Sequence, residues 1–242
     1  SIAHRLPEIL EADVRFDDDY VAPEPGPGAG YLRPRDEREF DIVFADGADV
    51  GPVVLRQRGL AAMINATAAT TMAREVLGDA FRPEAAAAAL AALNPPFGRG
   101  EVVDVDGQPL ELVLVKNPAG FTVALSTYGS TPVATMIAIN DEDADGRDVS
   151  WLYDVSFESL RDRGVFMTSG TRAYDMALRL AYDDVRVDET EVALVPALDR
   201  FLAAHPDEPK RLFCTYTAMM SLRRTLAARY GLPEFGEEVA SV

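Results

Sequence analysis

Cysteine and histidine are scarce in this sequence. Cys214 is the single cysteine among 242 residues, and His4 and His205 are the two histidines. One cysteine excludes a disulfide within the chain and any zinc site made of clustered cysteines. Because the two histidines lie far apart, beside predicted loops, a histidine-based metal site and a Ser-His-Asp triad are disfavoured as well. We predict no metal site in this chain, and we expect Cys214 to be a buried apolar residue in or beside a strand.

Basic residues and long apolar runs are also lacking. The chain has 23 Lys and Arg against 40 Asp and Glu, which gives a formal net charge of −17. Such a charge repels phosphates, so nucleic acid and anionic membrane are excluded as main partners. No run of about 18 apolar residues occurs. The opening S-I-A-H-R-L-P-E does not have the pattern of a signal peptide. We therefore expect no transmembrane segment and a cytoplasmic location.

The first hundred residues read as short strands followed by two helices. Residues 1–58 contain the apolar segments D-V-R-F, E-F-D-I-V-F and V-V-L and a Pro/Gly loop at 23–30. Good helix formers then predict helices over 60–77 and 82–93, with Pro83 in the first turn of the second. The segment N-P-P-F-G-R-G ends the second helix.

From residue 101 onward, apolar strand patterns alternate with helix patterns. This alternation predicts right-handed βαβ crossovers and an α/β, Rossmann-like domain with a mostly parallel sheet over residues 101–242. The predicted strands lie at 111–115, 131–140, 165–170, 185–187 and 211–216, and the predicted helices lie within 117–128 and at 171–182, 192–203 and 218–230.

Three predicted loops leave the carboxyl ends of strands, where open α/β sheets bind their ligands. They are K-N-P-A-G-F at 116–121, N-D-E-D-A-D-G-R-D at 140–148 and T-S-G-T-R at 168–172. Their lysine, asparagines, acids and arginines suit a charged ligand handled with a cation, such as a nucleotide or an acyl phosphate. The third loop either offers a helix N-terminus to a phosphate or simply caps a helix.

The loop at 140–148 is strongly acidic. It begins like an EF-hand, but the twelfth position is Leu152 instead of glutamate and a strand pattern precedes it, so calcium is disfavoured. A solvated acidic turn is the alternative to a functional loop. We favour function, because five neighbouring acids repel one another unless something cationic is near. These acids are Asp141, Glu142, Asp143, Asp145 and Asp148.

Two phosphate-binding motifs are absent from the sequence. Neither G-x-x-x-x-G-K-[ST] nor a G-x-G-x-x-G after a strand occurs. Any triphosphate must therefore be held mainly by something outside this sequence.

Four long motifs resemble the C-terminal domain of the MurT subunits of lipid II isoglutaminyl synthase, in the Mur ligase family. Two upstream motifs resemble the end of a Mur-ligase central domain. The resemblance implies a partial central domain over 1–100 and a MurT-type α/β domain over 101–242. The C-terminal motifs span 115–121, 138–158, 168–180 and 215–223, and the upstream ones span 58–70 and 97–101.

The resemblance implies an ATP-dependent amidation in peptidoglycan synthesis. The α-carboxyl of D-glutamate in the lipid II stem peptide becomes an acyl phosphate, and ammonia converts it to D-isoglutamine. A GatD-type glutaminase partner supplies the ammonia, and ATP and Mg²⁺ are the implied cofactors. The place of action is the cytoplasmic, inner face of the membrane.

The resemblance also suggests site residues. Asp145 is the candidate catalytic group, because Gly146 allows a sharp turn that brings this carboxylate over the sheet edge, where it orients ammonia or accepts a proton. Asp148 and Asp154 are the alternatives for this role. Arg99 and Asn117 are candidates for contact with the nucleotide or its phosphates.

This chain departs from the family pattern in two ways. It lacks the P-loop and the four cysteines of a zinc ribbon, so we expect the later part of a MurT that does not act on ATP alone. Zinc is expected only if an upstream segment carries those cysteines. The main alternative is a non-catalytic α/β module that docks an amidotransferase-like partner. Mur-type folate or cyanophycin ligases are a third, weaker choice.

Overall fold

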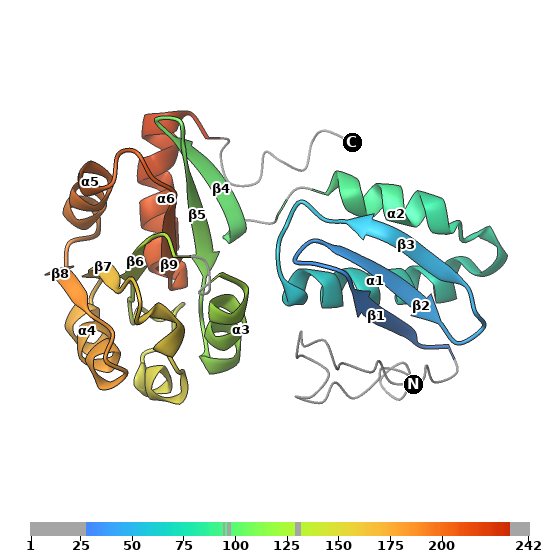
Figure 1. The fold of residues 1–242 in the computed structure, drawn as a ribbon, viewed down its shortest axis with the longest axis horizontal. Helices are drawn as coiled ribbons and strands as arrows, with labels where there is room; N and C mark the ends of the chain where they lie inside the picture. The colour runs from blue at the N-terminus through green and yellow to red at the C-terminus, as the bar shows by residue number, and fades with distance from the viewer. Residues whose placement is uncertain (1–27, 94, 96–97, 129–131, 233–242) are drawn as a thin grey trace. The chain divides into compact units, whose positions relative to one another are not determined.

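The computed structural model describes residues 28–93, 95, 98–128 and 132–232. Two units form, over residues 1–94 and 95–242 (Figure 1). We expected the division after residue 100; it falls earlier because Arg99 already belongs to a strand of the second unit. His4, the D-V-R-F segment and most of the loop at 23–30 lie outside the described residues.

The first unit pairs a three-stranded antiparallel sheet with two helices. Its strands are β1 (Gly30–Pro34), β2 (Glu39–Phe44) and β3 (Asp49–Val54), in the order β1-β2-β3. Its helices are α1 (Leu60–Leu77) and α2 (Pro83–Ala92), as predicted. Phe40, Ile42 and Met63 are fully buried between sheet and helices. β1 was missed, because its five residues run from a glycine to a proline and lack an apolar alternation, and they pair with β2 as a strand.

The second unit contains a six-stranded sheet in the order β4-β5-β9-β6-β7-β8. All neighbouring strands are parallel except β4, which pairs antiparallel with β5 at one edge. The predicted α/β class and mostly parallel sheet are confirmed. The strands are β4 (Arg99–Val105), β5 (Gln108–Leu114), β6 (Ala134–Ala138), β7 (Val165–Ser169), β8 (Val187–Glu191) and β9 (Lys210–Cys214).

Four helices cover the two faces of this sheet (Figure 1). They are α3 (Pro118–Tyr128), α4 (Ala173–Tyr182), α5 (Leu194–Ala204) and α6 (Tyr216–Tyr230). One apolar cluster joins the sheet to α5 and α6, and a second joins it to α3 and α4. Every residue of β6 and β9 is buried, as expected for parallel strands covered on both faces.

Two edge strands differ from the sequence prediction. β4 was missed, and the strand predicted at 185–187 is β8, which runs from Val187 to Glu191. Val185 belongs to the turn after α4, where it is buried beside Asp184, a residue with a positive φ of 57°. Edge strands bury one face at most, so their sequences lack the continuous apolar run of a central strand. None of the described helices has the length and apolar character that a membrane crossing requires.

Candidate functional site

The carboxyl ends of three central strands lie side by side. In the sheet, Ala138 at the end of β6 is level with Ser169 of β7 and with Cys214 of β9. The chain therefore continues from these three strands into loops that meet at one edge. This edge is where an open α/β sheet places its ligand-binding loops.

Asn140 connects the three loops. Its backbone N–H donates to Thr215 Oγ1 at 2.8 Å and its side-chain Nδ2 donates to Thr217 Oγ1 at 2.9 Å. Its Oδ1 accepts the backbone N–H of Thr171 at 3.0 Å. The side chain is buried, so these hydrogen bonds fix the relative positions of the loops. Sequence analysis placed Asn140 in the acidic loop but did not foresee this linking position.

Gly170 allows the close approach of two of these loops. Its φ is +90°, and an added Cβ would lie 2.3 Å from the Ile139 carbonyl oxygen and 2.7 Å from Asn140 Oδ1. Only glycine fits at this position without displacing backbone.

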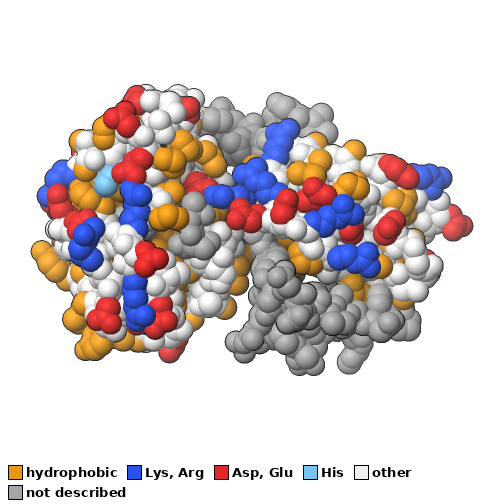
Figure 2. All heavy atoms as spheres, viewed as in Figure 1, with side chains coloured by type: hydrophobic (Ala, Val, Ile, Leu, Met, Phe, Trp, Pro, Cys, Tyr) orange, Lys and Arg blue, Asp and Glu red, His pale blue; other side chains and the backbone are white. Residues whose placement is uncertain are grey.

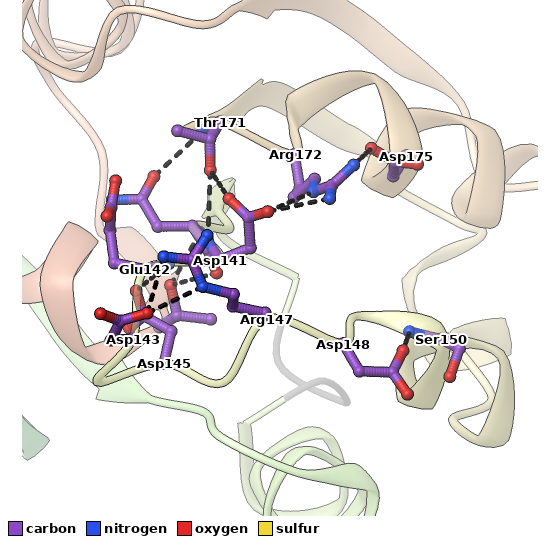
Figure 3. A network of polar contacts seen from close by, with 12 residues as sticks. Asp141, Glu142, Asp143, Asp145, Arg147, Asp148, Ser150, Thr171, Arg172 and Asp175 are labelled. Carbon is purple, nitrogen blue, oxygen red and sulfur yellow. Dashed lines mark hydrogen bonds and ion pairs between the residues drawn. The ribbon is translucent and has the colours of Figure 1, made fainter.

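Asp145 caps the helix that follows β9 (Figure 3). Its Oδ1 accepts the backbone N–H of Thr217 at 2.8 Å, and its Oδ2 accepts from the Thr217 hydroxyl and from the Glu142 N–H, the latter at 3.3 Å. Thr217 is the second residue of α6, so the carboxylate satisfies the exposed end of that helix. The carboxylate reaches the sheet edge through the turn at Gly146, whose φ is +87°. It is only 6% exposed and its oxygens are engaged.

Two other acids of this loop have separate protein partners. Asp141 accepts from the Thr171 hydroxyl at 2.8 Å and from the Arg172 Nε at 2.9 Å. The Thr171 hydrogen bond, together with the Arg172 guanidinium, lowers the pKa of Asp141 below its ordinary value. Asp143 accepts from Arg147 at 2.8 Å, in an exposed pair. The cations that relieve the predicted repulsion are therefore two arginines of the chain itself.

Asp148 and Asp154 are the more accessible carboxylates. Asp148 is exposed and accepts the backbone N–H of Ser150 at 2.8 Å, which lowers the pKa of Asp148. In Figure 3 it points away from the Asp141–Asp145 group. Asp154 is exposed at the end of the short 3-10 helix η4 (Ser150–Asp154).

The two candidate nucleotide contacts lie apart from the Asn140 hydrogen bonds. Asn117 is exposed, and its Oδ1 accepts the backbone N–H of Gly120 at 2.8 Å, so it caps α3. Arg99 is exposed at the start of β4. In the described part of the chain, neither side chain shares a hydrogen bond or an ion pair with Asn140 or Asp145.

The T-S-G-T-R loop uses its backbone amides within the protein. The N–H groups of Gly170, Thr171 and Arg172 donate to Val192 O, Asn140 Oδ1 and Ile139 O, at 3.2, 3.0 and 2.9 Å. These contacts favour the structural interpretation of this loop over phosphate binding. Among the described residues, no three His, Cys, Asp or Glu side chains are arranged to hold a metal ion.

The prediction that Cys214 is a buried residue is confirmed. Cys214 is fully buried, and burial raises the pKa of its thiol well above the ordinary value, so it is not a nucleophile. Phe157 and Trp151 pack around Phe121, and Met219 is buried. Tyr153 is 53% exposed.

The chain is similar to three solved structures, and these likenesses show the fold. It matches folylpolyglutamate synthase from Mycobacterium tuberculosis, complexed with ADP, with a TM-score of 0.58 and 20% identity over 85% of this chain and 48% of that one. For a pseudomurein peptide ligase type C from Methanothermus fervidus, the TM-score is 0.60 and the identity is 14%, over 82% of this chain and 41% of that one. For MurF from Acinetobacter baumannii, the TM-score is 0.58 and the identity is 17%, over 83% of this chain and 44% of that one.

Comparisons of sequence identify relatives more specifically than the fold does. Residues 114–219 match the family described as MurT ligase C-terminal. The MurT subunit of lipid II isoglutaminyl synthase from Streptococcus pneumoniae is 30% identical over 138 residues, which are 55% of this chain and 31% of that protein. The subunit from Staphylococcus aureus strain COL is 36% identical over 94 residues, 37% of this chain and 22% of that protein. The matches thus span a third or less of these curated relatives.

Proposed function

We propose that this chain serves as part of the MurT-type subunit of a lipid II isoglutaminyl synthase. The observation that carries the proposal is that the family match over 114–219 contains the whole set of loops joined by Asn140 and Asp145. The loops lie at the sheet edge where α/β proteins place their ligands.

The proposed reaction has two steps. ATP transfers its γ-phosphoryl group to the D-glutamate α-carboxylate of lipid II, which gives an acyl phosphate and ADP. Ammonia then attacks the acyl carbon, and phosphate leaves as the amide of D-isoglutamine forms and loses a proton. A GatD-type glutaminase supplies the ammonia, and the reaction takes place at the cytoplasmic face of the membrane.

In this proposal ATP and Mg²⁺ bind mainly to residues outside the sequence, because the chain carries no P-loop motif. Arg99 and Asn117 provide additional contacts to the nucleotide or its phosphates. Both are exposed. Asn117 uses its Oδ1 to cap α3, which leaves its side-chain NH₂ as the group that would donate to a phosphate oxygen.

The acidic loop divides two tasks between two carboxylates. Asp145, our prediction from sequence for the catalytic group, is buried and hydrogen-bonded to Thr217, an arrangement that suits a positioning residue. Asp148 is exposed, and the Ser150 hydrogen bond that lowers its pKa keeps it ionised. An ionised carboxylate beside the acyl phosphate would orient ammonia and stabilise the ammonium formed on attack. Asp154 is the second exposed candidate for this role.

The test reconstitutes the reaction from this chain, a P-loop-bearing Mur ligase half and the glutaminase. Amidation of lipid II would be followed by mass spectrometry with ATP, Mg²⁺ and glutamine. We expect Asp148→Asn to lower the rate by about 10²–10³-fold without loss of assembly, as for the removal of a group that stabilises developing charge. Asp143→Asn, which changes an exposed carboxylate of the same loop, is the matched control. A near wild-type rate for Asp148→Asn would transfer the role to Asp154 or Asp145.

A second variant separates positioning from chemistry at Asp145. Thr217→Val removes the hydroxyl that donates to Asp145 and leaves the carboxylate in place. If Asp145 acts by holding the loop, Asp145→Asn and Thr217→Val should lower the rate to a similar extent. A much larger loss for Asp145→Asn would assign the reacting atoms to Asp145 itself.

The second candidate is a non-catalytic module that docks an amidotransferase-like partner. One observation favours it: at the carboxyl edge, Asp145 and the amides at 170–172 are already engaged within the protein. Under this function the glutaminase binds normally, and none of the Asp145, Asp148 or Asp154 variants changes the amidation rate.

A further inference from the structure

The outward face of α4 is apolar. Tyr174, Leu178 and Tyr182 are 68%, 53% and 69% exposed, and their spacing of four residues places them on one side of the helix. Tyr153 of η4 extends this surface, because its ring centroid lies 6.0 Å from that of Tyr182. We call these four residues the α4 tyrosine face. A surface helix normally carries polar residues on its outer side, so this face is unusual.

The fold does not require these side chains. The inward face of α4 already supplies the core contacts through Ala173, Met176 and Leu180, each of which is fully buried. Tyr174 and Leu178 therefore stabilise little in the unit alone. Three aromatic rings in one exposed group are typical of the centre of a protein–protein interface, where tyrosine is enriched.

Three carboxylates lie close in sequence to the α4 tyrosine face, and one of them, Asp175, is paired with Arg172 at 3.6 Å. Asp154 follows Tyr153, Asp175 follows Tyr174 and Asp184 lies two residues after Tyr182, and all three are exposed. In Figure 2 orange side chains gather at the lower left, where Figure 1 draws α4, with red side chains beside them. This acidic rim and the net charge of −17 repel an anionic membrane, a nucleic acid and a second copy of the chain.

We infer that the α4 tyrosine face docks a partner protein through an apolar patch bordered by arginine and lysine. Tyrosine rings pack against apolar side chains and against guanidinium groups, and the acidic rim complements a basic border. The inference rests on the proposed function, under which this partner is the glutaminase subunit. A stable interface buries about 800 Å² on each partner, so the four residues form its centre, not its whole area.

The experiment measures binding of the purified glutaminase to the 242-residue chain by calorimetry. The test variant is Tyr174→Ala/Leu178→Ala, and the control is Val102→Ala/Val195→Ala, which shortens two exposed apolar side chains elsewhere in the same unit. We expect Kd to rise at least about tenfold for the test variant and to stay within about twofold for the control. Added salt should weaken wild-type binding. If the double variant melts early, Tyr174→Ala alone replaces it.

The outcomes separate the docking face from the proposed function. Unchanged affinity in the test variant, with tight wild-type binding, would overturn the docking face and leave the partnership standing. No binding by the wild-type chain would overturn the partnership and the docking face with it. Self-association of the wild type that the test variant loses would assign the face to a second copy and overturn a basic partner.

Discussion

At the carboxyl edge of the six-stranded sheet, the amide of Asn140 and the carboxylates of Asp141 and Asp145 join several loops, whereas at the amino edge the contacts gather on one carboxylate, that of Glu208. Asn140 connects the carboxyl-edge loops through Thr171, Thr215 and Thr217. A neutral amide can donate and accept at once, so a single side chain serves three loops.

The amino edge is built around Glu208. Its carboxylate accepts from Arg163, contacts His205 Nδ1 at 2.6 Å, and its backbone carbonyl accepts from Lys210 Nζ at 2.8 Å. Arg163 also donates to the carbonyl of Pro132, just before β6, at 3.3 Å. Burial lowers the pKa of Lys210, which opens β9. This edge therefore joins the starts of three strands by charge.

This difference indicates which edge of the sheet has a charged group accessible to a ligand. The amino edge satisfies its charges internally, near partly buried side chains. The carboxyl edge engages Asp141 and Asp145 within the protein but leaves Asp148 exposed. Asp148 therefore remains accessible at the edge where α/β sheets generally place their sites.

The largest effect on stability is expected from breaking the carboxyl edge at Gly170. Gly170→Ala would place a Cβ 2.3 Å from the Ile139 carbonyl oxygen at a φ of +90°. We expect a loss of about 2–4 kcal/mol, from backbone strain plus displacement of the loop. Gly107→Ala is the matched control, because its φ is +85° and nothing lies within 4 Å of the added atom.

Urea unfolding would measure both glycine variants. The control should lose about 1 kcal/mol, which is the conformational cost alone. Equal losses for the two variants would mean that the loop moves at Gly170 without an energetic cost. The close approach of Gly170 to Ile139 would then not contribute to the stability of this edge.

A smaller effect is expected from Asp145→Asn. The amide has one acceptor oxygen, so either the Thr217 N–H or its hydroxyl loses its acceptor, at a cost of about 1–3 kcal/mol. The burial of the side chain is the reason to expect a measurable loss of stability. Asp148→Asn, at an exposed position, should stay within about 0.5 kcal/mol. Thermal and urea unfolding of both variants would reveal whether the two carboxylates differ in this way.

The sequence reveals the central strands better than the site. β5, β6, β7 and β9 were predicted because strands covered on both faces carry continuous apolar runs. β4 was missed, since its apolar residues alternate with polar ones and its pairing with β5 creates the strand.

The hydrogen bond between Asp145 and Thr217 had no local signal. The two residues are 72 positions apart, and the order of the strands alone brings their loops together. The turn at Gly146 was predicted, because a glycine after an acidic run is a local feature. Its partner across the sheet edge depends on β9 lying next to β6, which periodicity does not reveal.

The smallest effect concerns the amino edge and depends on pH. Burial acts to raise the pKa of Glu208, but hydrogen bonds from His205 and Arg163 outweigh it, so the pKa in the folded chain is lowered. A carboxylate with a lowered pKa stabilises the fold above its unfolded pKa, and that contribution disappears as the pH falls through the folded value. Glu208→Gln should therefore cost stability at pH 7, by less than about 1 kcal/mol because the group is partly exposed and screened.

The gap in the free energy of unfolding between wild type and the Glu208→Gln variant should close in acid, below the ordinary glutamate range. Urea unfolding at pH 7 and at successively lower pH measures this gap, and Glu158→Gln, in an exposed pair with Arg161, is the control that should show almost none. A gap that stays constant with pH would mean that Glu208 acts by packing, and the charge-based account of the amino edge would lose its energetic basis.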